Sequence, residues 1–169
     1  MLNRLLISSL ILVMSLSFFE LKLDAIERQG VTIREQFMIE QYLGNNEGLE
    51  QLVAYYYDYF FTETLFFAMG TSWAIGGDYG GYGTALIGFG YLYPLNEKSF
   101  LDIKVYSGAG GHAAIQAGGG TLVAWQFGLS YLITDTMRLD FRYGGLDYTA
   151  GSYEVNTLSL GISYFYERF

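Results

Sequence analysis

The chain has 169 residues, of which 51% are hydrophobic, 18% are aromatic and only 15% are charged, and its formal net charge is −8. Soluble domains usually carry about a quarter charged residues, so this composition is unusual for a protein that meets water on all sides. The acidic balance provides no basic footprint for a nucleic acid. The lack of cysteine excludes disulfides and thiolate metal sites, and the high hydrophobicity excludes a disordered chain.

The first 30 residues predict an exported protein. Arg4 precedes fifteen uncharged residues, Leu5 to Phe19, which are fewer than the roughly 20 apolar residues of a spanning helix. A short positive region followed by an apolar stretch of this length is typical of a secretory signal peptide. We predict a signal peptide over residues 1–17, with the cleavage site between 17 and 25, and a short periplasmic segment over 18–30. The alternative is an uncleaved anchor helix.

Alternation of apolar and polar residues with a period of two dominates the chain after about residue 30. In the last such stretch Leu158, Leu160 and Ile162 share one face, and the residues between them are serine or glycine. The first stretch alternates least clearly, because Glu35 and Gln41 interrupt its apolar face, and its start also fits a short helix. The predicted strands span residues 31–43, 49–61, 64–76, 83–93, 99–107, 121–134, 137–143 and 154–166.

The connections between these eight strands alternate in length. The longer ones read GNNEG, GGDYGGYG, SGAGGHAAIQAGGG and GLDYTAGSY, whereas the shorter ones read TET, PLNEK and TDT. Short turns on one side and longer loops on the other are typical of bacterial outer-membrane barrels. An even number of strands then places both termini on the short-turn side, which is periplasmic in that layout.

The charged residues of the strands lie on the small, glycine-rich face. A soluble barrel needs its charges on the outward face, whereas large apolar residues that face outward are required in lipid. We therefore predict an all-β fold, an eight-stranded antiparallel up-and-down transmembrane β-barrel over residues 31–169, located in the outer membrane with lipid as its partner. The predicted charge network of the lumen consists of Arg34, Glu40, Asp58, Asp102, Lys104, Arg138, Asp140 and Arg142.

These lumen charges favour a closed barrel. Acids and bases are nearly balanced, which favours ion pairs because unpaired buried charges are costly. Eight strands leave an interior that side chains just fill. We therefore expect a structural or surface-interaction role; the alternatives are a narrow or gated pore for small solutes and a lipid-modifying outer-membrane enzyme.

The end of the chain resembles the C-terminal assembly signal of bacterial outer-membrane β-barrels. That signal has a polar residue, a glycine, an aromatic residue and an aromatic or apolar residue at fixed spacing. Ser159, Gly161, Tyr164 and Tyr166 fill these positions. A terminal phenylalanine such as Phe169 is typical of the class, although here it is out of phase with the lipid-facing residues. The resemblance implies recognition by the barrel-assembly machinery.

Residues 100–148 are similar to the small "outer membrane β-barrel domain" proteins that are grouped with the OmpA- and OmpX-like barrels. This resemblance implies a fold and an outer-membrane location. It implies no single activity, because a fold does not fix a function.

The sequence predicts neither an enzyme nor a cofactor or metal site. His112 is the single histidine, and it lies in the longest loop. A catalytic base needs a positioned nucleophile, and the His-x-Ser pattern of barrel lipid A deacylases is absent because Ala113 and Ala114 follow His112. One histidine provides too few ligands for a metal, and the glycine-rich loops lack the ending of a phosphate-binding loop.

We interpret these loops as flexible surface segments. Tyrosines in exposed loops are candidates for contact with a surface partner or a glycan. The tyrosines concerned are Tyr79, Tyr82, Tyr148 and Tyr153.

Overall fold

The computed structural model describes residues 31–43, 50–76, 81–111, 120–150 and 154–168. The predicted signal peptide over 1–17, the segment 18–30, His112 and Phe169 lie outside these residues. In the part of the chain that the structure describes, no helix is long and apolar enough to cross a membrane.

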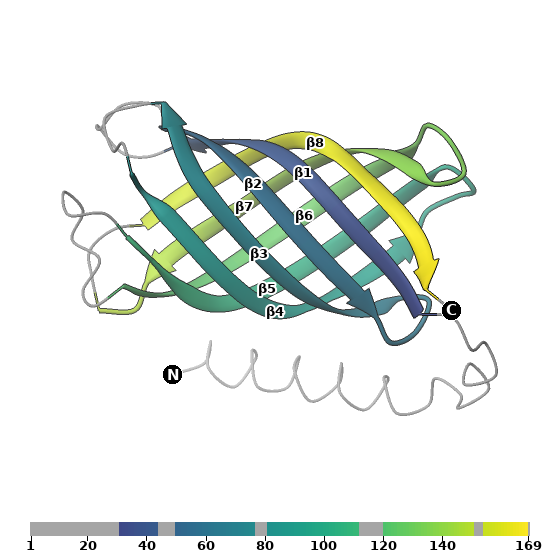
Figure 1. The fold of residues 1–169 in the computed structure, drawn as a ribbon, viewed down its shortest axis with the longest axis horizontal. Helices are drawn as coiled ribbons and strands as arrows, with labels where there is room; N and C mark the ends of the chain where they lie inside the picture. The colour runs from purple at the N-terminus through teal and green to yellow at the C-terminus, as the bar shows by residue number, and fades with distance from the viewer. Residues whose placement is uncertain (1–30, 44–49, 77–80, 112–119, 151–153, 169) are drawn as a thin grey trace, which may run out of the picture.

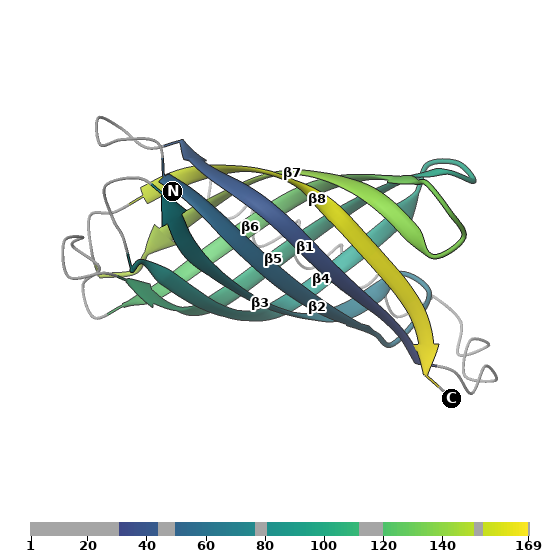
Figure 2. The ribbon, with the colours of Figure 1, turned by 45° about the horizontal axis from the view of Figure 1, so that its top comes forward.

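The described residues form a closed antiparallel barrel of eight strands (Figure 1, Figure 2). Each strand pairs with its neighbours in sequence, and the first strand closes the sheet by pairing with the last from Val31↔Arg168 to Leu43↔Asn156. This arrangement confirms the predicted fold. The strands are β1 (Val31–Leu43), β2 (Glu50–Phe60), β3 (Leu65–Gly76), β4 (Gly83–Pro94), β5 (Ser99–Gly111), β6 (Thr121–Leu132), β7 (Met137–Tyr148) and β8 (Glu154–Arg168).

The short turns lie at the end of the barrel where β1 begins and β8 ends (Figure 1). Side-chain oxygens fix each of these three turns. Thr62 Oγ1 accepts a hydrogen bond from the Leu65 amide at 2.9 Å, and Asn96 Oδ1 accepts one from the Ser99 amide at 2.9 Å. Asn and Thr side chains favour turns for this reason, because they replace backbone partners locally. We call this end of the barrel the turn side and the other end the loop side.

The largest differences from the predicted strands occur in β5 and β7. β5 continues to Gly111 and β7 to Tyr148, beyond the ends predicted at residues 107 and 143. Glycines hide the alternation in both extensions. They face the closest approaches between strands, because a Cβ on Gly108 or Gly144 would overlap a carbonyl oxygen of the adjacent strand. β1, by contrast, is a strand over its whole length, and it has no helical start.

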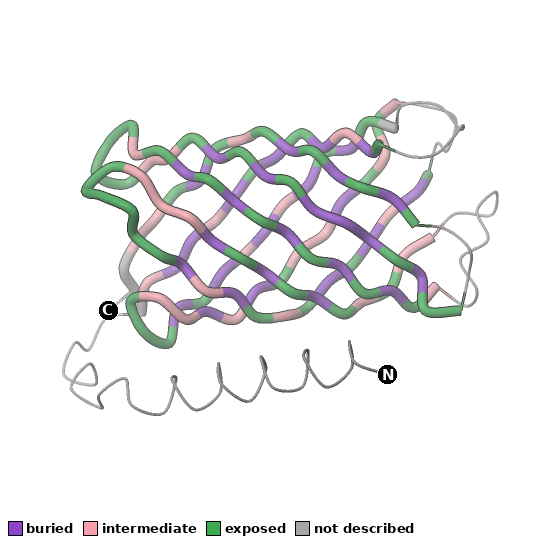
Figure 3. The backbone as a smooth tube through the Cα atoms, turned by 180° about the vertical axis from the view of Figure 1, so that it is seen from behind, coloured by how far each residue is buried: buried purple, intermediate pink, exposed green. Residues whose placement is uncertain are grey.

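Alternation separates the two faces of the sheet. Figure 3 shows buried and exposed residues following one another along the strands. Large apolar side chains point outward, with exposed fractions of 53% for Trp73, 58% for Phe89 and 55% for Leu160. Arg34 and Asp58 point inward and are fully buried. The burial is thus inverted relative to a soluble protein, and apolar side chains cover the outside.

Close strand packing predicts a strong position dependence for glycine substitution. A Cβ on Gly88 would overlap the Val105 carbonyl oxygen and lie 2.9 Å from the Tyr106 Cα, whereas the nearest atom to a Cβ on Gly76 is Gln51 Oε1 at 3.7 Å. We expect Gly88→Ala to lower the free energy of unfolding by about 1–3 kcal/mol, because the backbone must shift to relieve the overlap. Urea unfolding in detergent measures this, with Gly76→Ala as the control. Equal effects of both substitutions would contradict the packing described here.

Candidate functional site

The centre of the lumen holds a buried arginine that connects opposite walls of the barrel. Arg34 lies on β1, and its Nε is 2.7 Å from Asp58 Oδ2 on β2. Its Nη1 is 2.8 Å from Asp102 Oδ2 on β5, four strands away around the barrel. All three side chains are fully buried. The second ion pair therefore crosses the lumen.

Two further cations extend these ion pairs along the lumen. Lys104 Nζ lies 2.9 Å from both carboxylate oxygens of Asp58 and donates to Gln36 Oε1 at 2.6 Å. Arg142 binds Asp102 with two parallel contacts, Nη1 to Oδ1 at 2.6 Å and Nη2 to Oδ2 at 3.0 Å. Paired contacts of this kind fix geometry as well as charge.

The chain of ion pairs ends at Asp140. Its Oδ1 lies 3.8 Å from Arg142 Nη2 and accepts a hydrogen bond from the Ser130 hydroxyl. Among the described residues the connected side chains are Lys104, Asp58, Arg34, Asp102, Arg142 and Asp140. Three cations balance three carboxylates, so the cluster, which we call the ionic layer, has no net formal charge. This balance reduces the large cost of burying each ion alone.

Arg138 lies nearer the turn side and is not part of the ionic layer. Its guanidinium carbon is 3.5 Å from the centre of the Phe100 ring and 3.9 Å from that of Phe165. Its Nε and Nη1 are buried without a hydrogen-bond partner among the described residues. Cation–π contacts replace hydrogen bonds here, and the aromatic side chains close this part of the lumen.

Glu40 lies on the loop-side flank of the ionic layer. Its Oε1 accepts hydrogen bonds from the Tyr56 hydroxyl at 2.6 Å and from the Ser159 hydroxyl at 3.3 Å. Tyr56 in turn accepts one from Gln126 Nε2 at 2.6 Å. No ion pair joins Glu40 to a cation within the described ranges. Neutral donors thus hold this carboxyl group, and it stays separate from the other predicted lumen acids.

Buried tyrosines fill the lumen at the loop side. The Tyr148 hydroxyl donates to the Tyr82 hydroxyl at 3.2 Å, and the Tyr42 ring packs edge-on against Tyr82 with 5.7 Å between ring centres. Tyr82 and Tyr148 are only 3% and 2% exposed. Their predicted position on the loop surface is therefore wrong: Tyr148 is the last residue of β7, Tyr82 directly precedes β4, and both side chains point inward. Tyr79 and Tyr153 lie outside the described residues.

The described residues of the lumen leave a small void between these layers. A void of about 10 Å³ lies beside Glu40, Tyr56 and Gln126, and a volume of this size holds about one water molecule. Among the described residues, no group of three or more metal-ligating side chains could hold an ion. The lumen is therefore a packed polar and aromatic core.

Several aromatic side chains of this core were not identified from the sequence. Tyr56, Phe66, Tyr106 and Phe165 face inward, on β2, β3, β5 and β8. Phe66 packs against Phe60 with 4.8 Å between ring centres. The period-two alternation could have identified them as inward-facing, because each lies an even number of residues from a charged residue or a glycine on the inward face of the same strand.

The residues of the predicted assembly signal divide between the two faces of β8. Ser159 faces the lumen, and Gly161 lies against β1, where a Cβ would overlap the Phe37 carbonyl oxygen. Tyr164 and Tyr166 face outward, with ring centres 6.0 Å apart.

Comparison with known proteins supports the fold. No protein family and no curated protein match the chain. The solved structures that match include a de novo designed transmembrane β-barrel, with a TM-score of 0.61, 15% identity and coverage of 80% of this chain and 95% of that one. The N-terminal β-barrel domain of Pseudomonas aeruginosa OprF matches with a TM-score of 0.58 and 13% identity, over 82% of this chain and 100% of that one. Ail, the attachment invasion locus protein of Yersinia pestis, matches with a TM-score of 0.54 and 15% identity, over 81% of this chain and 98% of that one. The chain therefore has the fold of small eight-stranded transmembrane β-barrels.

The ionic layer predicts a large penalty for removing one carboxylate. Asp102→Asn leaves Arg34 and Arg142 without their shared partner, so we expect the free energy of unfolding to fall by about 3–5 kcal/mol. Asp147 faces outward at the loop-side end of β7 and is exposed. We therefore expect Asp147→Asn to change the free energy of unfolding by no more than about 0.5 kcal/mol. Guanidinium unfolding in detergent micelles compares the two variants. Similar values for both would show that the ionic layer contributes little to stability.

Proposed function

We infer that this protein is an integral outer-membrane β-barrel with a closed lumen and a structural or surface-interaction role. The observation that carries the proposal is the inverted barrel: apolar side chains cover the outside, and paired charges fill the inside. An aqueous environment on both faces would leave the outer apolar surface exposed, whereas a bilayer covers it. The closed sheet also leaves no unpaired strand edge, which a membrane-spanning sheet requires.

The packed lumen supports a barrier rather than a channel. An ion or small solute would have to displace the Arg34–Asp102 pair, which crosses the lumen at 2.8 Å. It would also have to pass the rings of Phe60, Phe66 and Phe165 on the turn side. Eight-stranded barrels have an interior that side chains just fill, and this lumen follows that rule.

The orientation and the surface role follow from the layout of the two ends. The short turns, the start of β1 and the end of β8 lie at one end, which we assign to the periplasm. The opposite end, where the sequence has its four longer connections, we assign to the cell surface. Ail is named for attachment and invasion, and we propose that the loop side of this chain likewise serves surface contacts. The C-terminal residues Ser159, Gly161, Tyr164, Tyr166 and Phe169 would be read by the barrel-assembly machinery during insertion.

A heat-shift gel tests the membrane assignment. The full chain is expressed in a bacterium that has an outer membrane, and the membrane fraction is run on an SDS gel before and after boiling. We expect a faster-migrating band before boiling that disappears afterwards, because a closed barrel resists SDS and stays compact. A protein found in the soluble fraction without such a band would contradict the proposal.

Planar-bilayer conductance tests the closed lumen. We expect the inserted wild-type barrel to give no channel steps, because the ionic layer and the aromatic rings occupy the cross-section. A sixteen-stranded porin, whose barrel leaves an aqueous channel, provides the positive control in the same bilayer. Regular conductance steps from the wild type would instead establish the alternative, a narrow pore.

A further inference from the structure

A carboxylate interrupts the apolar outer face. Glu35 points outward from β1 on the same face as the exposed Phe37, and its register partners are Tyr57 on β2 and Tyr164 on β8. The other outward acids of the described strands, Asp147 and Glu154, lie where β7 and β8 meet the loop side. Glu35 is therefore unusual, because it lies within the part of the strands that lipid would cover.

Tyrosines surround this carboxylate without neutralising it. The Tyr166 hydroxyl donates to Glu35 Oε1 at 2.8 Å, and Tyr55 lies two residues before Tyr57, the register partner of Glu35 on β2. No cationic side chain among the described residues lies within ion-pair distance of Glu35. This neutral donor uses about a quarter of the acceptor sites of a carboxylate. A charged group at a lipid-facing position is costly without an opposite charge, so the site lacks a cation.

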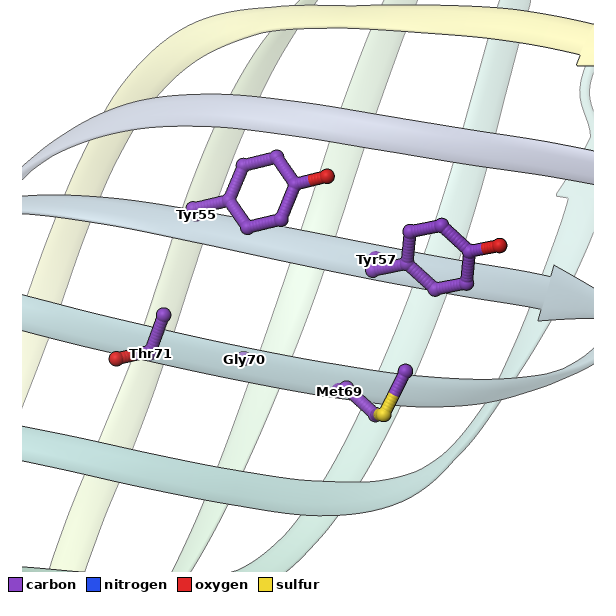
Figure 4. A pocket seen from close by; sticks show the side chains of 5 residues that line it. All are labelled: Tyr55, Tyr57, Met69, Gly70 and Thr71. Atoms are coloured by element: carbon purple, nitrogen blue, oxygen red, sulfur yellow. The ribbon is translucent and has the colours of Figure 1, made fainter.

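An apolar groove lies on the far side of Tyr57, the register partner of this carboxylate on β2. It has a volume of about 320 Å³ and is lined by Tyr55, Tyr57, Met69, Gly70 and Thr71 on β2 and β3. Figure 4 shows both tyrosine hydroxyls directed along β2 toward the end of that strand, which is the turn side. Amphipathic side chains at a membrane surface direct their polar ends toward water in this way. The groove is therefore lined by two tyrosines whose polar ends point toward the turn side.

We propose that Glu35 and this groove bind a phospholipid with a primary-amine headgroup from the turn-side leaflet. The ammonium group lies against Glu35, and one acyl chain occupies the groove between Tyr55, Tyr57, Met69 and Thr71. The inference rests on the proposed membrane location. It goes beyond that location because it assigns one lipid class to one face of the barrel.

The chemistry of the site distinguishes a primary amine from other headgroups. A primary ammonium has three N–H donors, which match the acceptor sites that Tyr166 leaves open on Glu35. A quaternary ammonium has no N–H donor and interacts with the tyrosine rings through cation–π attraction alone. An anionic headgroup would be repelled by the carboxylate.

Native mass spectrometry of the purified full chain tests this site. The protein, extracted from the membranes of an expressing bacterium, is incubated in mixed micelles with equal amounts of phosphatidylethanolamine and phosphatidylcholine that have identical acyl chains. We expect the wild type to retain phosphatidylethanolamine over phosphatidylcholine by about fivefold or more, the effect of a charge-assisted contact. Glu35→Gln is expected to abolish this preference, and Thr71→Phe is expected to reduce retention of both lipids because it fills the groove.

The control variant is Asp147→Asn, which removes an outward carboxylate at the opposite end and is expected to leave the preference unchanged. Equal retention of the two lipids by the wild type, or an unchanged preference in Glu35→Gln, would overturn the inference. So would a dimer that Glu35→Gln dissociates, because a second copy would then cover the site. Each sample is also run on the heat-shift gel. A compact band without lipid preference refutes this inference alone, whereas loss of the band in the wild type refutes the membrane assignment itself.

Discussion

Closure of the sheet between β1 and β8 is the constraint on which the rest of the structure depends. The two strands pair along their whole length, from Val31↔Arg168 to Leu43↔Asn156. Closure satisfies the backbone hydrogen bonds that an open edge would leave unpaired. It also places different limits on the two faces, because the side chains inside must fit a small fixed volume, whereas no such volume limits the side chains outside. Every second residue must fit into that volume, and this requirement explains both the glycines and the charges of the inward face.

The lumen resolves this requirement by combining large side chains with very small ones. Arg34 contacts two carboxylates, and its guanidinium also lies 4.9 Å from the centre of the Phe66 ring. Gly90 provides the room for that ring, since a Cβ there would overlap Phe66. The planar guanidinium suits such a site, because it forms hydrogen bonds in its plane and stacks on aromatic rings above it. Ion pairs, rings and glycines therefore form a single packing unit.

The outer face follows different rules, because no fixed volume limits it. Large side chains such as Trp73, Phe89 and Leu160 point outward from β3, β4 and β8 and stay exposed. Glu35 departs from this pattern, and the structure shows what accompanies the departure: tyrosines from β2 and β8 lie next to it. A polar group on such a surface is informative because the surrounding solvent cannot hydrate it. Glu35 also interrupts the alternation of apolar and polar residues in the first strand.

The sequence by itself determined the fold class, the number of strands and the face to which most side chains belong. These properties are local, since alternation with a period of two is read along one strand and the turn residues mark its ends. The sequence also indicated which charges share the inward face, but not their partners. Arg34 and Asp102 are 68 residues apart, and only the closed barrel brings them together. The tertiary structure likewise decided that Glu40 and Arg138 stay apart from the ionic layer, that β5 and β7 continue through their glycines, and that Tyr82 and Tyr148 turn inward. Each of these features depends on the distance across the lumen or between adjacent strands, which the curvature of the closed sheet sets and no local pattern encodes.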